Sequence, residues 1–395
     1  MKTKNIVSTV TLNVSNMNKN KIFLCLLASL FFSCSGKQQQ GNEAPEISLQ
    51  AITLKTDTAL MNNHVYRLID NTLIVYQSAA AGAYLSACQI KNDSIIQLGT
   101  FLRKGSGPYE LPVLPRIIPD SKSKKLHIYH CTNASIIYTI PYPLQTNLLQ
   151  TSTWEVIRNK VKPNFFWGNS PCSMQLFGDS TFITIGGAIK EGEENSYVIN
   201  KYNPYTHQNT PIQGFNFRKE LPGNNIIKRR AYNEAYLFRQ SDKNRFAYIN
   251  SRGKYFCLFD IEEDTVKNFK TVLDQFPAYS VAKDGKNFNY DQNGFQGMEP
   301  RFTPHHIYLG EPPYASIKEW VEAGPYKGYS SDSFDRILVY DWDGNHVSTL
   351  LLNKPVTNFI VTEDDSCIYA SCDNLEEETE TIIKYNLPGF SNNGL

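Results

Sequence analysis

The sequence predicts an all-β fold from its composition, its turn spacing and the scarcity of helical periodicity. Tyrosine (23 residues) and phenylalanine (22 residues) are abundant, and aromatic and β-branched residues favour strands over helices. Short runs of these residues alternate with turn residues, whereas long apolar stripes of helical period are rare. The hairpins recur at roughly 50–60 residues, the spacing of four-stranded propeller blades. Six such units fit the length after Cys34, so we expect a six-bladed β-propeller of four-stranded antiparallel blades.

Two hairpins show this pattern clearly. Strands expected at 64–69 and 72–76 flank Asp70-Asn71, and Asp343-Gly344 separates two later strands. Both pairs are typical of tight β-turns. Further strands are expected at 125–130, 135–140, 181–185, 196–202, 245–249, 254–260, 336–342, 345–350, 366–371 and 381–385.

The propeller is predicted to span residues 51–390. A ring buries both faces of each blade and leaves only short edges, and the last strand is expected to complete it. A pair of β-sandwich domains would use the same strands. No linker rich in Pro, Gly and Ser divides the chain near its middle, which favours the single ring.

The N-terminal segment 1–33 is predicted to be a signal peptide, with Met17 as an alternative start. Basic residues precede an apolar run at 22–32, which is shorter than the ~20 residues that a membrane-spanning helix needs. Small Ser33 then precedes Cys34. This order is typical of a bacterial lipoprotein, in which Cys34 becomes the lipidated N-terminus and 34–50 form a polar tether. An N-terminal anchor helix is the alternative.

Charge and cysteine content narrow the possible partners. Lys+Arg (39) balance Asp+Glu (38), so no basic field attracts nucleic acid. We expect a cell-envelope protein, held at the outer membrane through lipid on Cys34, with the leaflet left open. The other body cysteines lack C-x-x-C spacing and are interpreted as small buried residues rather than disulfides. His127 and His130 point to opposite faces of one strand, and we expect no metal or cofactor.

The segment Arg103-Lys104-Gly105-Ser106-Gly107-Pro108-Tyr109-Glu110 carries a family resemblance. It resembles the G-x-G-P-x-E loop of TolB-like six-bladed β-propeller lipoproteins of gram-negative anaerobes. The hairpin at 339–345 resembles a late-blade hairpin of the same family. The resemblance implies the propeller fold and a lipid-anchored location. It implies no reaction, because the function of the family is largely unassigned.

Two groups of residues are candidate ligand sites. The first is the loop of Arg103, Lys104, Gly105, Gly107 and Glu110, whose backbone N–H groups would cradle an anion beside two basic side chains. Its structural alternative is a tight turn.

The second group is Trp320, Tyr326 and Tyr329, in a long excursion at 310–333 that includes a short helix expected at 316–322. These aromatic rings would stack on a sugar or a peptide. Their structural alternative is to cap the edge of a blade.

The favoured function is a non-enzymatic binding or scaffold module that recruits a peptide, a protein or a glycan through one propeller face. The sequence contains no G-x-S-x-G, H-E-x-x-H or P-loop motif, and we assign no catalytic residue. The alternative is a metal-dependent propeller hydrolase or lyase, which needs carboxylates or histidines that converge near the axis.

Overall fold

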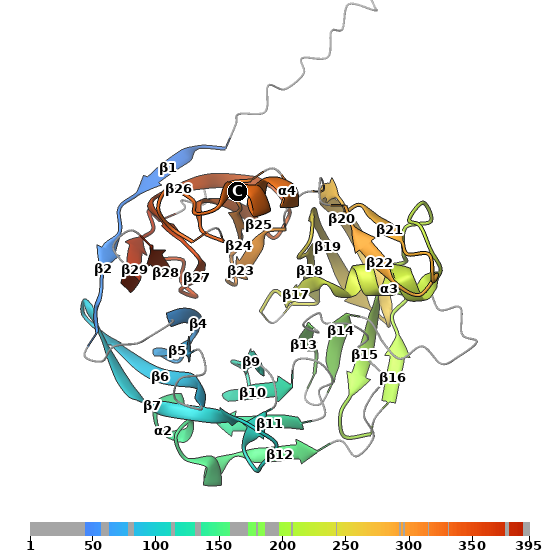
Figure 1. Cartoon of the computed structure of the whole chain (residues 1–395). Coiled ribbons are helices and arrows are strands. Elements are labelled where there is room, and N and C mark those ends of the chain that lie inside the picture. Colours follow the sequence, from blue (N-terminus) through green and yellow to red (C-terminus); the bar gives the residue numbers. More distant parts are fainter. Residues whose placement is uncertain are drawn as a thin grey trace, which may run out of the picture. The chain divides into compact units, whose positions relative to one another are not determined.

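The computed structural model describes residues 44–56, 63–77, 83–111, 115–130, 136–158, 173–178, 181–185, 197–206, 208–241, 243–291, 294, 297–314, 316–330, 332–375 and 379–389. Apart from Ala44, these belong to one compact unit, Pro45–Leu395. The predicted signal peptide and Cys34 lie outside the described residues. The predicted fold is confirmed, since six small sheets form a ring around a common axis (Figure 1).

Each of the first five blades contributes four consecutive antiparallel strands, numbered outwards from the axis. Blade 1 comprises β4 (Asn63–Ile69), β5 (Thr72–Gln77), β6 (Ala83–Lys91) and β7 (Ser94–Lys104). Blade 2 comprises β9 (Pro115–Asp120), β10 (Lys125–His130), β11 (Ile136–Pro141) and β12 (Glu155–Arg158). Blade 3 comprises β13 (Met174–Leu176), β14 (Phe182–Ile185), β15 (Ile199–Asn203) and β16 (Gln208–Pro211).

The second half of the ring continues the same order. Blade 4 comprises β17 (Ala235–Arg239), β18 (Arg245–Asn250), β19 (Lys254–Glu262) and β20 (Thr265–Gln275). Blade 5 comprises β23 (Glu299–Phe302), β24 (His306–Glu311), β25 (Phe334–Asp341) and β26 (His346–Val356). Blade 6 comprises β27 (Asn358–Val361), β28 (Cys367–Asn374) and β29 (Thr379–Asn386).

Three short N-terminal strands run along the outer edges of successive blades. β1 (Glu46–Leu49) pairs in parallel with β26 of blade 5, and β3 (Lys55–Thr56) pairs in parallel with β7 of blade 1. Between them, β2 (Ile52–Thr53) pairs antiparallel with β29 and becomes the fourth strand of blade 6. The N-terminal segment therefore completes the ring. Our expectation that the last strand would complete it was wrong.

The sheets begin at Glu46, inside the segment 34–50 that we predicted to be a tether. The cause is visible in the packing of two apolar residues. Leu49 is buried in the apolar cluster between blades 5 and 6, and Ile47 packs against that cluster. Burial of these side chains favours a strand over a solvated linker.

Apolar clusters fill each junction between neighbouring blades. One cluster joins blades 1 and 2 around Trp154, and another joins blades 6 and 1 around Leu54. Separate clusters fill the four remaining junctions, so each blade packs on both neighbours. Stability is consequently distributed around the ring, and each junction depends on its own residues.

The predicted turns have the backbone that their sequences favour. Asp70 and Asn71 have φ of 50° and 56°, and Gly344 has φ of 77°. Asn, Asp and Gly tolerate this left-handed region better than other residues do. The two turns thus direct their strands into antiparallel pairs, as the sequence predicted.

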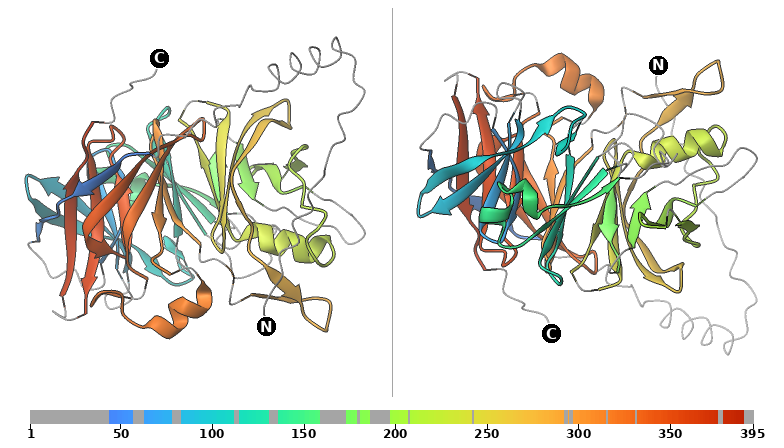
Figure 2. Two further views of the ribbon diagram at one scale, coloured as in Figure 1. Left: turned by 90° about the horizontal axis from the view of Figure 1, so that it is seen from above. Right: turned by 90° about the horizontal axis from the view of Figure 1, so that it is seen from below.

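The two ends of the ring differ. At the turn end, the first two strands of each blade meet in a hairpin turn, and α2 (Leu144–Asn147) and η1 (Thr151–Thr153) link β11 to β12. At the connection end, the outer strand of one blade leads to the next blade. Figure 2 shows α3, α4 and the β21–β22 hairpin at one end, and their places in the chain assign them to the connection end. These elements are α3 (Asn225–Asn233), α4 (Ile317–Ala323), β21 (Tyr279–Val281) and β22 (Phe288–Tyr290). A further short strand, β8 (Glu110–Leu111), follows β7 and pairs with it.

Helix α4 confirms the helix that we expected within the excursion. The Glu319 N–H donates to the Ser316 hydroxyl, which is a favourable N-cap. Helix α3 was not expected. It begins after Asn224, whose side-chain oxygen accepts from the Ile227 N–H over 3.0 Å. The signal for α3 in the sequence was the capping residue Asn224, because a helix of this length is too short to show a long apolar stripe.

Candidate functional site

The loop predicted to cradle an anion lies at the connection end, between blades 1 and 2. Its own carboxylate fills the cradle, because the Gly107 N–H donates to Glu110 Oε2 over 2.8 Å. A Cβ on Gly105 would overlap the same carboxylate, while the side chains of Arg103 and Lys104 are exposed. The contacts of Glu110 are those of the tight turn that was the structural alternative. Binding of an external anion here stays a prediction.

The three predicted aromatic residues lie on blade 5, away from that loop around the ring (Figure 1). Each of them is half-buried. Tyr326 and Tyr329 exchange two backbone hydrogen bonds of 2.9 and 2.8 Å, and the Tyr326 hydroxyl donates to the Asp335 carboxylate. Tyr329 packs against the cluster between blades 5 and 6, whereas Trp320 lies on α4. The structure therefore does not bring the two predicted groups together, and a stacking role stays a prediction.

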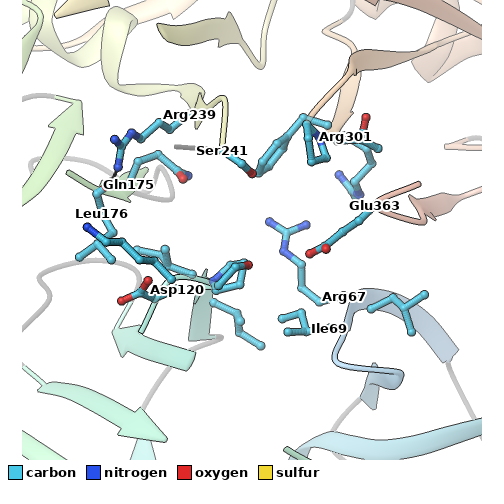
Figure 3. Close-up of a pocket in the computed structure, with 18 of the residues that line it drawn as sticks. Arg67, Ile69, Asp120, Gln175, Leu176, Arg239, Ser241, Arg301 and Glu363 are labelled. Atoms are coloured by element: carbon cyan, nitrogen blue, oxygen red, sulfur yellow. Dashed lines mark hydrogen bonds between the residues drawn. The ribbon is translucent and has the colours of Figure 1, made fainter. Parts of the chain in front are cut away.

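A pocket of about 820 Å³ lies on the axis at the turn end (Figure 3). Its wall comes from the innermost strands of all six blades and from the turns that follow them. Each blade contributes at least one polar residue, and these include Arg67, Asp120, Gln175, Arg239, Arg301 and Glu363. A cavity of several hundred Å³ is the size that holds small molecules or parts of larger ones. None of these six residues was predicted from the sequence.

Two arginines of the pocket hold neighbouring blades together. Arg301 donates from Nε to the Phe359 carbonyl over 2.5 Å and forms an ion pair of 2.6 Å with Glu299, so it links blade 5 to blade 6. Arg239 donates from Nη1 to the Leu176 carbonyl over 2.9 Å, which links blade 4 to blade 3. Both guanidinium groups are therefore used by the fold.

Arg67 differs from these two. Among the described residues, its side chain makes one hydrogen bond, a long contact of 3.4 Å from Nη1 to the neighbouring Tyr66 carbonyl, and forms no ion pair. The guanidinium also lies 5.7 Å from the centroid of the Tyr66 ring. Burial, together with the nearby charges of Arg301 and Arg116, lowers the pKa of Arg67 to about 10. The side chain is thus charged at neutral pH, and its guanidinium points into the pocket (Figure 3).

Two carboxylates also line the pocket. Asp120 accepts from the backbone N–H of Ser123 over 3.1 Å and from the Ser123 hydroxyl, so it is engaged within its own turn. Glu363 is exposed and lies on the same side of the pocket as Arg67 (Figure 3). With Lys122, the cationic groups of the wall outnumber the two carboxylates.

Histidines and cysteines supply no comparable cluster. Within the described ranges, no three His, Cys, Asp or Glu side chains lie close enough to hold a metal ion. His127 is buried with Nδ1 3.0 Å from the Thr139 hydroxyl, and burial lowers its pKa to about 4. Cys257 and Cys367 are free thiols and Cys88 and Cys372 are buried, while the other two body cysteines lie outside the described residues. The axial metal site of the alternative function stays a prediction.

A buried polar network joins blades 5 and 6 next to the pocket. The Asp365 carboxylate lies 2.7 Å from His306 Nδ1 and accepts from the Tyr308 hydroxyl over 2.9 Å. Asp365 follows β27 in a turn and has φ of 56°. The three residues touch one another from two blades, and sequence reasoning missed them because they lie far apart in the chain.

Comparisons with known proteins identify no family. No family model and no curated protein matches the sequence. Solved structures that align with the chain include three with TM-scores below 0.5. A member of the DUF4221 family from Bacteroides vulgatus aligns with a TM-score of 0.45 and 12% identity, over 87% of this chain and 98% of its own.

The other two structures are more distant. A protein of unknown function from Bacteroides thetaiotaomicron aligns with a TM-score of 0.41 and 10% identity, over 85% of this chain and 75% of its own. Raptor from Chaetomium thermophilum aligns with a TM-score of 0.38 and 9% identity, over 80% of this chain and 22% of its own.

In the part of the chain that the structure describes, no helix has the length and apolar character needed to cross a membrane.

Proposed function

We propose that this protein is a lipid-anchored binding protein of the cell envelope, which holds part of a peptide, a protein or a glycan in its axial pocket. One observation carries the proposal: all six blades contribute to the wall of a single pocket. The wall is therefore fixed by the packing of the whole ring, and loops on such a scaffold commonly carry binding. No reaction is part of the proposal.

The proposal places the ligand at the turn end. The two groups predicted from the sequence lie at the connection end, where the Glu110 carboxylate accepts from the Gly107 N–H and the Asp335 carboxylate accepts from the Tyr326 hydroxyl. The axial pocket instead offers unfilled volume and a guanidinium that is left without an ion pair among the described residues. Polar groups that converge on such a cavity favour it as the binding site.

Lipid on Cys34 at the outer membrane is the proposed anchor, in keeping with the resemblance to TolB-like lipoproteins. Cys34→Ala is expected to move the full chain from the membrane fraction to the soluble fraction of a fractionated cell and to abolish labelling by a fatty acid. Cys25→Ala is the matched control, because Cys25 lies within the apolar run that is removed with the signal. A Cys34→Ala protein that stays in the membrane would instead indicate the anchor helix.

Filling the pocket is expected to abolish binding. An added Cβ at Gly178, which lines the pocket, meets nothing within 4 Å, so Gly178→Trp is expected to add an indole to the pocket wall. Gly389→Trp is the matched control, because Gly389 has equal free space and lies outside the pocket. Envelope peptides and glycans that the immobilised full chain retains should be lost with Gly178→Trp and kept with Gly389→Trp. Equal retention by both variants would exclude the axial pocket as the site.

A further inference from the structure

We propose that the axial pocket recognises an anionic group of its ligand, namely a carboxylate, a phosphate or a sulfate, and that Arg67 binds this group. The inference rests on the proposed function only in taking the pocket as the binding site. It adds the chemical class of the ligand and the residue that selects it.

The first observation is the contrast among arginines in one pocket. Arg239 and Arg301 use their guanidinium groups to bond carbonyls and a carboxylate of adjacent strands. Among the described residues, the Arg67 guanidinium has the long contact to the Tyr66 carbonyl and lies 5.7 Å from the centroid of the Tyr66 ring, and no carboxylate pairs with it. A charged group that is partly removed from water is costly unless it is paired and hydrogen-bonded. The fold gains little from Arg67, so a partner from outside the chain is the consistent explanation.

The second observation is the charge around Arg67. Arg301 and Arg116 both lie close enough to disfavour the charge on Arg67, and Glu299 and Tyr66 are the groups that favour it. Glu299 is already paired with Arg301 at 2.6 Å. Arg67 and Arg301 both line the pocket, so an anion bound there would relieve their mutual repulsion, whereas a cation would add to it.

The third observation is the form of the donor. A guanidinium presents parallel N–H groups that match two oxygens of a carboxylate, a phosphate or a sulfate. The guanidinium of Arg67 is directed into the pocket from β4, opposite the side of Arg239 (Figure 3). Glu363 is the competing carboxylate of the chain itself, but among the contacts of the described residues it forms no ion pair with Arg67. An external anion would therefore bind Arg67 without displacing a carboxylate of the described residues.

The volume of the pocket indicates the size of the ligand that bears the anionic group. About 820 Å³ is far more than one inorganic ion fills. An acidic sugar or the acidic end of a peptide would occupy the remaining space beside apolar wall residues such as Ile117, Phe177 and Ile360. The anionic group is thus proposed to belong to an organic ligand, and a free inorganic anion is the simpler source that the test must separate.

Calorimetry on the purified full chain tests this proposal. The probes are glucuronate with glucose as its neutral match, and inorganic sulfate and phosphate. Glucuronate is expected to bind and glucose to bind at least about tenfold more weakly, because hydrogen bonds to charged groups contribute strongly. Arg67→Met should weaken glucuronate binding at least about tenfold. Arg158→Met removes an exposed arginine from β12, the outermost strand of blade 2, and should change the affinity less than about twofold.

Two further variants keep the test decisive. Arg67→Lys keeps the charge without the fork, and it should fold and bind glucuronate more weakly than the wild type. Glu363→Gln removes the competing carboxylate and should tighten binding. Equal binding of glucose and glucuronate, unchanged binding in the Arg67 variants, or loss of binding in Arg158→Met would each overturn the inference.

The same experiments distinguish an organic acidic ligand from a free inorganic anion. They also distinguish failure of this inference from failure of the proposed function. Sulfate or phosphate that binds as tightly as glucuronate would overturn the organic ligand and leave only a free anion site. A wild-type protein that binds none of the charged probes, but whose envelope ligand is still lost with Gly178→Trp, would overturn the anion and leave the proposed function standing. Failure of the Gly178→Trp test itself would overturn the proposed function.

Discussion

Leu54→Ala is expected to lower the free energy of unfolding by about 2–5 kcal/mol, the range for buried leucines in protein cores. Leu54 follows β2, is 4% exposed and packs between blade 6 and blade 1 with Val65, Leu73 and Ile360. Its N–H also donates to the Ile382 carbonyl over 3.1 Å. The residue thus joins the N-terminal segment to both blades at the junction where the ring closes. Urea denaturation followed by tyrosine fluorescence measures the change.

The control for this prediction lies two residues earlier. Ile52 lies in β2, pairs with Lys384 of β29 and is 37% exposed. Ile52→Ala should therefore cost less than about 1 kcal/mol. Equal effects of the two substitutions would mean that closure by β2 does not depend on the apolar junction. A small effect of Leu54→Ala alone would show that the N-terminal segment contributes little to the ring.

Asp365→Ala is the second change with a large expected effect, a loss of about 3–5 kcal/mol of stability. The substitution leaves His306 Nδ1 and the Tyr308 hydroxyl, both buried, without the carboxylate that they contact. It also places alanine at a φ of 56°, which Asp tolerates better. Thermal and urea unfolding of the purified full chain measure the loss.

Two variants separate the network from the turn. Asp364→Ala removes an exposed neighbour that accepts from the Ser366 N–H over 3.1 Å, and it should cost about 1 kcal/mol or less. Asp365→Asn keeps a residue that tolerates the left-handed region and should lie between the two. If Asp365→Ala were no worse than Asp364→Ala, the buried network would not hold blades 5 and 6 together.

The local part of the fold was predictable from the sequence. Asp70-Asn71 and Asp343-Gly344 determine their hairpins through residues that accept positive φ, and this is a property of the turn alone. The closure of the ring was not predictable in the same way. β2 spans only Ile52–Thr53, too short to show any alternation, and its partner β29 lies at the other end of the chain. Such pairing is decided by packing between distant segments.

The candidate site shows the same division. The strand that contains Arg67 was predicted, but its register around the axis was not, and a shift of one residue turns each side chain to the other face. One available signal was an arginine in the innermost strands of four blades, at Arg67, Arg116, Arg239 and Arg301. Without the ring, nothing in the sequence shows that these residues approach one axis. The loop at 103–110 was conspicuous because turns have local motifs, and pocket walls do not.

Native mass spectrometry of the full chain purified from its own envelope tests the central claim most directly. The account predicts one organic molecule bound per chain, with an acidic group, that is retained in Gly389→Trp and lost in both Gly178→Trp and Arg67→Met. Metal analysis of the same sample tests the alternative function, a metal-dependent hydrolase or lyase. A stoichiometric metal ion that only a chelator removes, with no organic molecule bound, would contradict the account and indicate an axial catalytic site.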